Sequence, residues 1–369
     1  MRIARLRLRG FRCYEEAEVE INPSLTVVHG ANGAGKTSLL EGLYFGCTGR
    51  SCRTASERAV IRFGADHARV VVELEGEDGR HELAVAVASG SGKRAWVDGA
   101  AVERVTEASW RPLVAVFLPS RLELVAGPPA HRRAHMDQLV AAMWPARREA
   151  RLAYARALAQ RNALLGRIRS GRAGSEALGA WDAELARCGI ELRDNREAAI
   201  ARVQQSFMEH ATALGLDGDA TVLYRPRTRA ATAEELMGEL AQRAAADIER
   251  GSTGHGPHRD ELVFQREGHE LRAYGSQGQQ RLALLALLLA ERSALAAERG
   301  SAPVLLLDDV MSELDAERRE RLAAVLRDGA GQAIVTATEL EHVPGSTAPG
   351  VGRLAVAGGR ILAAKALAA

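Results

Sequence analysis

The chain has 369 residues, of which 47% are hydrophobic and 26% charged, and its formal net charge is +2. This length allows one large or two modest domains with an ample core, and the small net charge means that any nucleic-acid surface must come from local clusters of arginine. The start of the chain lacks a signal sequence, its longest apolar run is too short to cross a membrane, and its four cysteines lack metal-site spacing, so we expect a soluble, reduced, cytoplasmic protein.

The first part of the chain has the pattern of strands around one helix. Residues 1–11 alternate, with Leu6 and Leu8 on one face and arginines on the other, as in a strand with one wet face. A short apolar run at 24–30 precedes a helical pattern from Thr37 to Phe45. Four further strand-like stretches follow, at 68–76, 81–88, 93–99 and 113–119. The first three predict an antiparallel sheet beside a strand–loop–helix unit.

The loop of that unit, "GANGAGKT", fits the phosphate-binding pattern G-x-x-x-x-G-K-[ST]. Its glycines let backbone N–H groups surround phosphates, Lys36 reaches the β and γ oxygens, and the Thr37 hydroxyl can bind Mg²⁺. The only lysines are Lys36, Lys93 and Lys365, so one of the three falls where an ammonium is required. A plain glycine-rich turn is the alternative. The residues expected to bind nucleotide are Gly30, Ala31, Asn32, Gly33, Ala34, Gly35, Lys36, Thr37 and Ser38.

From about residue 133 to 214 the pattern is helical and rich in Ala, Leu, Arg and Glu. Apolar residues between Trp181 and Phe207 recur at helical spacing, and "SGRAGS" separates them from an earlier helix. Two helices joined by such a turn predict an antiparallel hairpin, in which roughly 25 residues would project on the order of 40 Å. We therefore expect an α/β head in two parts, residues 1–130 and 251–369, interrupted by an all-helical lobe at 131–250.

The stretch "YGSQGQQR" opens the apolar helix that follows, and two interpretations fit it. Ser276 and Gln279 have the spacing of a capping box, which satisfies N–H groups at a helix start. This leaves Gly278 unexplained, because glycine disfavours a helix. A helix start of small residues also binds anions. Since one P-loop already serves one triphosphate, Ser276, Gly278 and Gln279 would then cover the triphosphate of a second copy, in an ATP-dependent homodimer.

The stretch "VLLLDDV" is a buried parallel strand by its unbroken apolar run, and its carboxylates follow the strand where ligands of such sheets bind. We expect Asp308 to hold Mg²⁺ and Asp309 to orient the attacking water or accept its proton. Two aspartates that only cap the next element are the alternative. In "SELD", Ser312 to Asp315, the pattern is that of another helix N-cap, which does not exclude a role at an interface.

These motifs together resemble those of a known family. "SQGQQ" before "VLLLDDVMSELD", with a helical insertion between two halves of a head, is similar to the ABC-type ATPases of the SMC class, and within that class to the RecF family. "LRLRGFRCYEE", "LPSRLELVAGPPAHRRAHMDQ" and "GHGPHRDEL" extend the resemblance almost end to end. It implies an ABC-type α/β head with mixed and antiparallel sheets, and a slow, DNA-stimulated ATPase that uses ATP and Mg²⁺. It also implies that Ser276 acts in trans and that Ser312 and Asp315 form a D-loop.

The resemblance implies partners as well. RecF proteins act in DNA repair and replication as recombination mediators. Such a protein dimerises on ATP and binds single- and double-stranded DNA at gaps and junctions. It works with RecO and RecR, and indirectly with RecA, and does not bind membranes.

The chain departs from the usual ABC pattern at three places. Asp309 stands where most ABC ATPases have glutamate, which fits slow hydrolysis, Thr338 lies near the place of the usual switch histidine, and "LVAVFLP" has no Q-loop glutamine. Two alternative functions are the ATPase subunit of a membrane transporter, which lacks a projecting hairpin, and an SMC-like chromosome ATPase, whose arms are much longer than this insertion.

Overall fold

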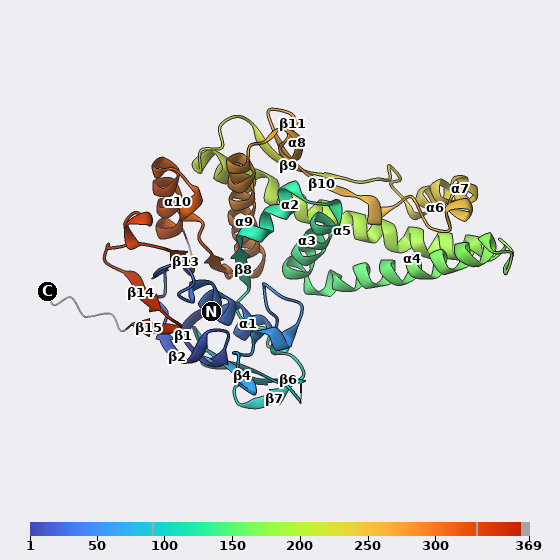
Figure 1. Cartoon of the computed structure of the whole chain (residues 1–369). Helices are drawn as coiled ribbons and strands as arrows, with labels where there is room; N and C mark the ends of the chain where they lie inside the picture. The colour runs from blue at the N-terminus through green and yellow to red at the C-terminus, as the bar shows by residue number, and fades with distance from the viewer. Residues whose placement is uncertain (91, 330, 363–369) are drawn as a thin grey trace. The chain divides into compact units, whose positions relative to one another are not determined.

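A computed structural model of the chain describes residues 1–90, 92–329 and 331–362 (Figure 1). The chain divides into two units: a head unit, Met1–Arg121 with Leu295–Ala369, and a lobe unit, Leu122–Ala294. The lobe unit extends beyond the expected insertion at both ends. It takes in residues 251–294, which the sequence patterns had assigned to the head.

The head unit contains a six-stranded antiparallel sheet of order β2-β1-β4-β5-β6-β7. Its strands are β1 (Arg2–Phe11), β2 (Tyr14–Glu20), β4 (His67–Gly76), β5 (Gly79–Ala88), β6 (Gly92–Val97) and β7 (Ala100–Val102). Along β1, Leu6 and Leu8 are buried while Arg9 is exposed, as the alternation in the sequence predicts. The expectation of an antiparallel sheet after the first helix is confirmed.

A second six-stranded sheet of the head unit has the order β15-β14-β3-β13-β12-β8. Its strands are β3 (Leu25–His29), β8 (Val114–Phe117), β12 (Val304–Leu307), β13 (Ala333–Ala337), β14 (Val351–Ala357) and β15 (Arg360–Leu362). All neighbours pair in parallel except β14 and β15, and α10 (Ala316–Asp328) connects β12 to β13. Because parallel strands end at one edge, the loop after β3 and the aspartates after β12 share that edge.

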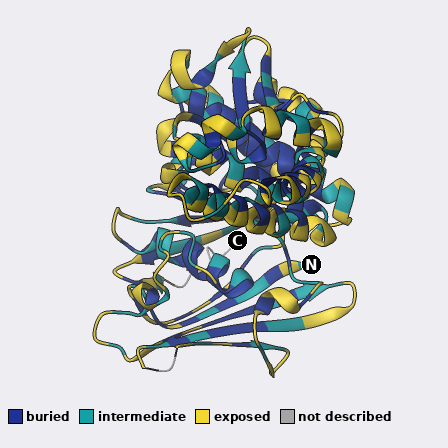
Figure 2. Cartoon of the chain, turned by 90° about the vertical axis from the view of Figure 1, so that its right-hand side faces the viewer, coloured by how far each residue is buried: buried dark blue, intermediate teal, exposed yellow. Residues whose placement is uncertain are grey.

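Helix α1 (Lys36–Thr48) belongs to the core that joins the two sheets. Its Leu39 and Leu43 pack in one hydrophobic cluster with residues of both sheets, whose buried stretches are dark blue in Figure 2. A Cβ at Gly46 would lie 2.3 Å from Val72 Cγ2, so the helix approaches β4 this closely only because residue 46 is glycine. The packing fixes the N-terminus of α1, and with it the phosphate-binding loop, against the sheets.

The lobe unit is mainly helical. Its helices are α2 (Glu123–Ala126), α3 (Pro129–Met143), α4 (Arg148–Arg169), α5 (Leu178–Ala213), α6 (Ala233–Gln242), α7 (Ala244–Arg250), α8 (Leu271–Tyr274) and the first part of α9 (Gln277–Arg299). Helices α4 and α5 lie side by side as an antiparallel hairpin (Figure 1), with Tyr154 of α4 in one core with Leu185 and Leu192 of α5. The predicted hairpin is confirmed. No helix in the described part of the chain is long and apolar enough to cross a membrane.

The lobe unit also contains a three-stranded antiparallel sheet of order β11-β10-β9. Its strands are β9 (Ala220–Arg225), β10 (Glu261–Arg266) and β11 (His269–Glu270). Residues 131–250 are therefore not helical throughout, because β9 lies among them. The reason is long-range pairing: Arg225 of β9 lies opposite Glu261 of β10, and "TVLY" is rich in residues that favour strands.

Candidate nucleotide-binding site

The loop between β3 and α1 owes its course to three glycines. Gly30, Gly33 and Gly35 have φ angles of 151°, 77° and 121°, in the region that favours glycine. A Cβ at Gly30 would lie 2.1 Å from Val356 O, and one at Gly35 would lie 3.0 Å from Tyr14 Oη. The head unit therefore fixes this loop in a tightly turned shape, which is what the predicted phosphate-binding loop requires.

Lys36 begins α1 and is 7% exposed. Its Nζ donates to Gly30 O at 2.7 Å and to Ala31 O at 3.1 Å. Within the described residues no carboxylate pairs with this ammonium. The first turn of α1 also has no acidic residue, so no side chain of that turn itself compensates the positive end of the helix dipole. A buried cation with neutral partners at a helix N-terminus attracts an anion such as phosphate.

Asp308 follows β12 and is 6% exposed. Thr37 Oγ1 donates to it and lies 3.0 Å from Oδ1 and 2.9 Å from Oδ2, while Thr336 Oγ1 donates to Oδ1 at 2.8 Å. Burial raises the pKa of Asp308 above its usual value, and the two hydroxyl donors oppose this rise. The hydrogen-bond donors to this carboxylate are neutral hydroxyl groups. A bound cation would stabilise its ionised form more strongly than they do.

These oxygens fit a magnesium ion bound together with a nucleotide. Mg²⁺ prefers oxygen ligands, keeps several waters, and takes only one or two carboxylates from the protein besides substrate phosphates. Thr37 and Asp308 offer such oxygens beside the phosphate-binding loop. No cluster of three or more His, Cys, Asp or Glu side chains that could hold a metal by itself occurs in residues 1–90, 92–329 and 331–362. A cation at this position would therefore depend on the phosphates.

Asp309 adopts a left-handed backbone conformation with a φ of 50°. Its N–H donates to Thr336 Oγ1 at 2.8 Å, whereas its Oδ1 atom is buried and has no hydrogen-bond partner in the described residues. Backbone strain and unsatisfied buried polar atoms cluster at functional sites. Asp309 Oδ1 thus lacks a hydrogen-bond donor, which a water molecule bound together with the nucleotide would supply.

Ser312 and Asp315 have local roles after β12. Ser312 Oγ donates to Asp309 O at 2.9 Å, and Asp315 caps α10 by accepting from the Arg318 N–H at 2.9 Å. A helix cap in this stretch, which the sequence pattern placed at its serine with Asp at the fourth position, is present, but the capping residue is Asp315 and not Ser312. Ser312 instead belongs to a 3-10 turn, Met311–Glu313, and holds the backbone of Asp309. A role of either residue at an interface stays a prediction.

In the lobe unit, the stretch "YGSQGQQR" forms the start of α9. Ser276 N donates to Gln279 Oε1 at 2.9 Å, and Gln279 N donates to Ser276 Oγ at 3.3 Å, so the predicted capping box is present. A Cβ added at Gly278 would meet only Ser276 Oγ, at 3.9 Å. Contacts within the chain therefore do not require glycine at 278, and space remains there for a group from outside.

Two residues that the sequence patterns did not single out contact residues that those patterns did. Thr336 of β13 contacts both Asp308 and Asp309, and its only signal was a polar residue in an apolar strand. His342 Nδ1 lies 2.9 Å from Thr338 Oγ1. Thr338 stands near the place of the usual switch histidine. The residue that contacts it, four residues further along the chain, is itself a histidine.

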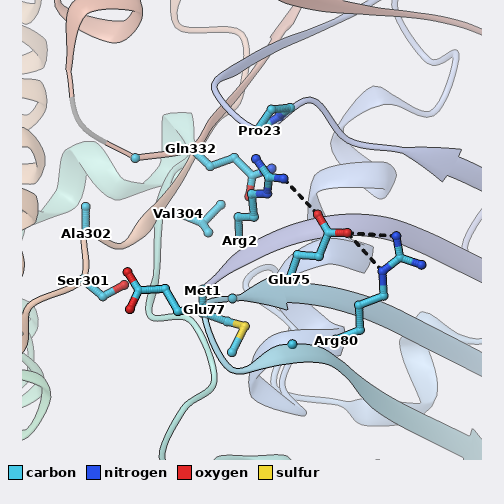
Figure 3. A pocket seen from close by; sticks show the side chains of 13 residues that line it. Met1, Arg2, Pro23, Glu75, Glu77, Arg80, Ser301, Ala302, Val304 and Gln332 are labelled. Carbon is cyan, nitrogen blue, oxygen red and sulfur yellow. Dashed lines mark hydrogen bonds and ion pairs between the residues drawn. The ribbon is translucent and has the colours of Figure 1, made fainter.

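A pocket of the head unit lies apart from the candidate nucleotide-binding site. It has a volume of about 740 Å³, and its lining includes Pro23, Val304 and Gln332, which precede or begin β3, β12 and β13. It therefore lies at the amino edge of the parallel sheet, opposite Asp308. Figure 3 shows Glu75 there between Arg2 and Arg80, at 2.9 and 3.1 Å. With Glu77 the lining carries two acidic and two basic side chains, so the pocket has no excess of positive charge that would favour a nucleotide.

Comparisons with known proteins agree with the motifs. The profile of the RecF/RecN/SMC N terminal domain matches residues 2–348. The DNA replication and repair protein RecF of Anaeromyxobacter sp. (strain Fw109-5) is 38% identical over 374 residues, which cover 98% of this chain and 99% of that protein. The chain belongs to the RecF family. The resemblance inferred from its motifs is confirmed.

Solved structures extend the RecF-family assignment to the fold. The recombination mediator protein RecF-ATP in the RecFOR pathway is similar with a TM-score of 0.83 and 25% sequence identity, over 98% of this chain and 97% of that chain. The Smc head domain from Pyrococcus furiosus, bound to the C-terminal domain of ScpA, shares the fold with a TM-score of 0.60 at 17% identity. The expected α/β ABC-type head is confirmed for this RecF-family chain.

Proposed function

We propose that this RecF-family chain binds ATP, hydrolyses it slowly, and uses ATP to control its binding to DNA during recombinational repair and replication. The observation that carries ATP binding is the arrangement of Lys36, Thr37 and Asp308 at one edge of the parallel sheet. The similar protein solved as RecF-ATP supports it. The chain would act in the cytoplasm.

In this proposal each residue of the site has one task. The loop and the start of α1 surround the phosphates, through Gly30, Ala31, Asn32, Gly33, Ala34, Gly35, Lys36, Thr37 and Ser38. Lys36 exchanges its carbonyl partners for the β and γ oxygens, which attract its charge more strongly. Thr37 and Asp308 hold Mg²⁺, which neutralises phosphate charge when bound. Asp309 orients a water and accepts its proton as the water oxygen bonds to the γ phosphorus and the bond to the ADP oxygen breaks.

We further propose that two copies form a dimer on ATP. Ser276, Gly278 and Gln279 would contact the triphosphate held by the other copy, while Ser312 and Asp315 would lie at the interface as a D-loop. The open space at Gly278, which no contact within the chain uses, supports an approach from outside. The capping box supports it too, because it holds the helix start in a fixed shape.

DNA is the proposed macromolecular ligand, both single- and double-stranded, at gaps and junctions. RecO and RecR are the proposed protein partners, and RecA would be loaded on gapped DNA as the indirect result. The RecFOR pathway named for a similar solved protein supports these partners. We also propose that residues 1–130 and 251–369 supply the two functional parts of the ATPase head and 131–250 the insertion, although residues 122–130 and 251–294 pack with the lobe unit.

A gapped duplex should therefore bind more tightly with ATP than without it. The affinity should also fall steeply with salt, because arginine contacts to phosphates release counterions. Fluorescence anisotropy of labelled gapped DNA over a salt series, with ATP, ADP or no nucleotide, measures both effects. Failure to bind any DNA, or binding that ignores salt, contradicts the proposal.

Replacing Asp309 with asparagine should leave ATP binding intact and lower hydrolysis by roughly 100-fold or more, because the base is lost. Asparagine tolerates a left-handed backbone, so the loop keeps its shape. The ATP-bound dimer should then accumulate. Single-turnover hydrolysis measures the chemical step, with Glu317→Gln as the control, since Glu317 is exposed on α10. An Asp309→Asn variant that hydrolyses ATP at the parent's rate excludes Asp309 as the base.

A further inference from the structure

Two stretches that the nucleotide site does not use meet at one pocket of the lobe unit. They are "YRPRTR" at 224–229 and "GHGPHRDEL" at 254–262. The pocket has a volume of about 370 Å³, and its lining residues are Arg227, Arg250, Gly254 and Arg259. Three arginines and a glycine, with no apolar side chain among them, give this pocket the chemistry of an anion site.

The positive charge of this arginine pocket is poorly compensated. The side chains of Arg227 and Arg259 are exposed, and within the described residues neither makes a hydrogen bond or an ion pair. Arg250 lies 3.4 Å from Asp247, a carboxylate that already binds the buried Arg161 at 2.8 Å. By contrast, Arg225 in the same stretch is paired with Glu270 at 2.6 Å. The pocket therefore presents guanidinium groups without a matching number of acids.

Buried hydrogen bonds hold the two arginine-bearing stretches together. Asp260 is fully buried and accepts from the Arg227 N–H at 2.8 Å, from Arg196 at 3.2 Å, and from the Tyr224 hydroxyl. One carboxylate thus ties the backbone of Arg227 to the residue that follows Arg259. Because the arginines rest on a fixed backbone, less entropy is lost when they bind a ligand.

His258 supports the same loop without adding charge. Its Nδ1 accepts from the Tyr154 hydroxyl at 2.7 Å and its Nε2 donates to Thr253 O at 3.0 Å. Burial, together with the positive charges of Arg259 and Arg133, lowers the pKa of His258 to about 4, so the ring is neutral at pH 7. The histidine therefore positions the loop, and the arginines alone carry the charge.

Gly254 gives the pocket its floor. A Cβ at this position would lie 2.2 Å from Arg250 Nη1, so the guanidinium lies across bare backbone. Planar guanidinium groups bind phosphate oxygens in pairs of hydrogen bonds, and a pocket without apolar lining has no place for an apolar peptide side chain. We propose that Arg227, Arg250 and Arg259 bind a backbone phosphate of DNA. This inference rests on the proposed function, since it names a contact site for the DNA assigned there.

The double substitution Arg227→Ala/Arg259→Ala tests the proposal in the full-length protein. We expect it to weaken binding of a gapped duplex about 10- to 100-fold, and to lower the slope of log K against log salt by about one to two. The thermal midpoint should not change, because both side chains are exposed and unpaired. Arg229→Ala is the matched control: Arg229 is an exposed arginine of the same stretch that does not line the pocket, so its loss should change little.

The possible outcomes distinguish a failure of the proposed arginine site from a failure of the proposed DNA-binding function. A parent chain that binds no DNA contradicts both. A parent that binds DNA while the double variant binds it equally, with the same salt slope, contradicts only the site. Free phosphate is the other source of the same ligand chemistry. Saturable binding of inorganic phosphate to the parent by calorimetry, lost in the double variant while DNA affinity stays unchanged, would overturn the assignment to DNA.

Discussion

Substitution of Lys36 by alanine should abolish ATP-dependent behaviour while the protein stays folded. The ammonium is the one charge in the phosphate-binding loop, and a hydrogen bond to a charged group contributes about 1.5–3 kcal/mol, so ATP affinity should fall at least 10- to 100-fold. In the parent, ATP at about 100 times its Kd stabilises the fold by about 2.7 kcal/mol. A 10- to 100-fold weaker affinity leaves about 1.4 to 0.4 kcal/mol at the same ATP concentration, so the variant should lose about half to most of this stabilisation. Thermal unfolding with and without Mg·ATP measures the loss.

Two further lysine variants sharpen this result. Lys36→Arg should fail like Lys36→Ala, because a planar guanidinium does not fit the place of a compact ammonium. Lys93→Ala is the control, since Lys93 bonds to Gly49 O at 3.0 Å and to Glu57 and belongs to β6. It should keep the full stabilisation by ATP. Normal ATP hydrolysis by Lys36→Ala contradicts the assignment of the loop.

Substitution of Ser276 by arginine should leave ATP binding to the monomer nearly intact and abolish ATP-dependent dimers together with hydrolysis. The larger, charged side chain would block the approach of the other copy's P-loop with its triphosphate. If Ser276 were only a cap, the substitution would cost about 1 kcal/mol of stability and leave dimerisation unchanged. Light scattering with Mg·ATP, combined with thermal unfolding, distinguishes the two cases.

Mixing the Ser276→Arg and Lys36→Ala proteins tests whether the site is shared. In a mixed dimer one composite site carries both substitutions and the other carries neither. Some ATPase activity should therefore return when the two inactive proteins are mixed. Two folded variants that associate and recover no activity contradict a site built from two copies.

Gly278→Ala distinguishes the two interpretations of this helix start, because it should raise the stability of the free protein and, if the site is shared, weaken the dimer. Alanine favours a helix over glycine by about 1 kcal/mol, and the added methyl meets open space within the chain, so the free protein should become more stable. If another copy must approach this surface closely, the same methyl group should weaken ATP-dependent dimerisation. A variant that is stabilised and still dimerises like the parent leaves only the capping interpretation.

Local patterns predicted much of the site because its parts are contiguous in sequence. The glycines before Lys36, the apolar run before Asp308, and the capping box at Ser276 each depend on neighbours within a few residues. The structure places the first two together because β3 and β12 lie in one parallel sheet. The prediction that the phosphate-binding loop and Asp308 lie together required only that both strands end at the same edge of the sheet.

The features that the sequence did not reveal depend on distant pairs. β9 is a strand because it pairs with β10, which follows it in the chain only after the α-helices α6 and α7 and a short 3-10 turn. Thr336 reaches both aspartates because β13 lies next to β12, a pairing that no local pattern encodes. The arginine pocket also joins residues brought together by Asp260. Single-sequence patterns indicate which residues are unusual, and tertiary contacts decide which of them meet.

The central claim is that two copies of this chain share bound ATP and that this state binds gapped DNA. The mass of the protein by light scattering, with Mg·ATP, with ADP and without nucleotide, each with and without gapped DNA, tests it most directly. The account predicts a monomer without nucleotide or with ADP, a dimer with ATP, and a dimer retained on gapped DNA. A chain that stays monomeric under every condition, or a dimer that forms regardless of nucleotide, would contradict it.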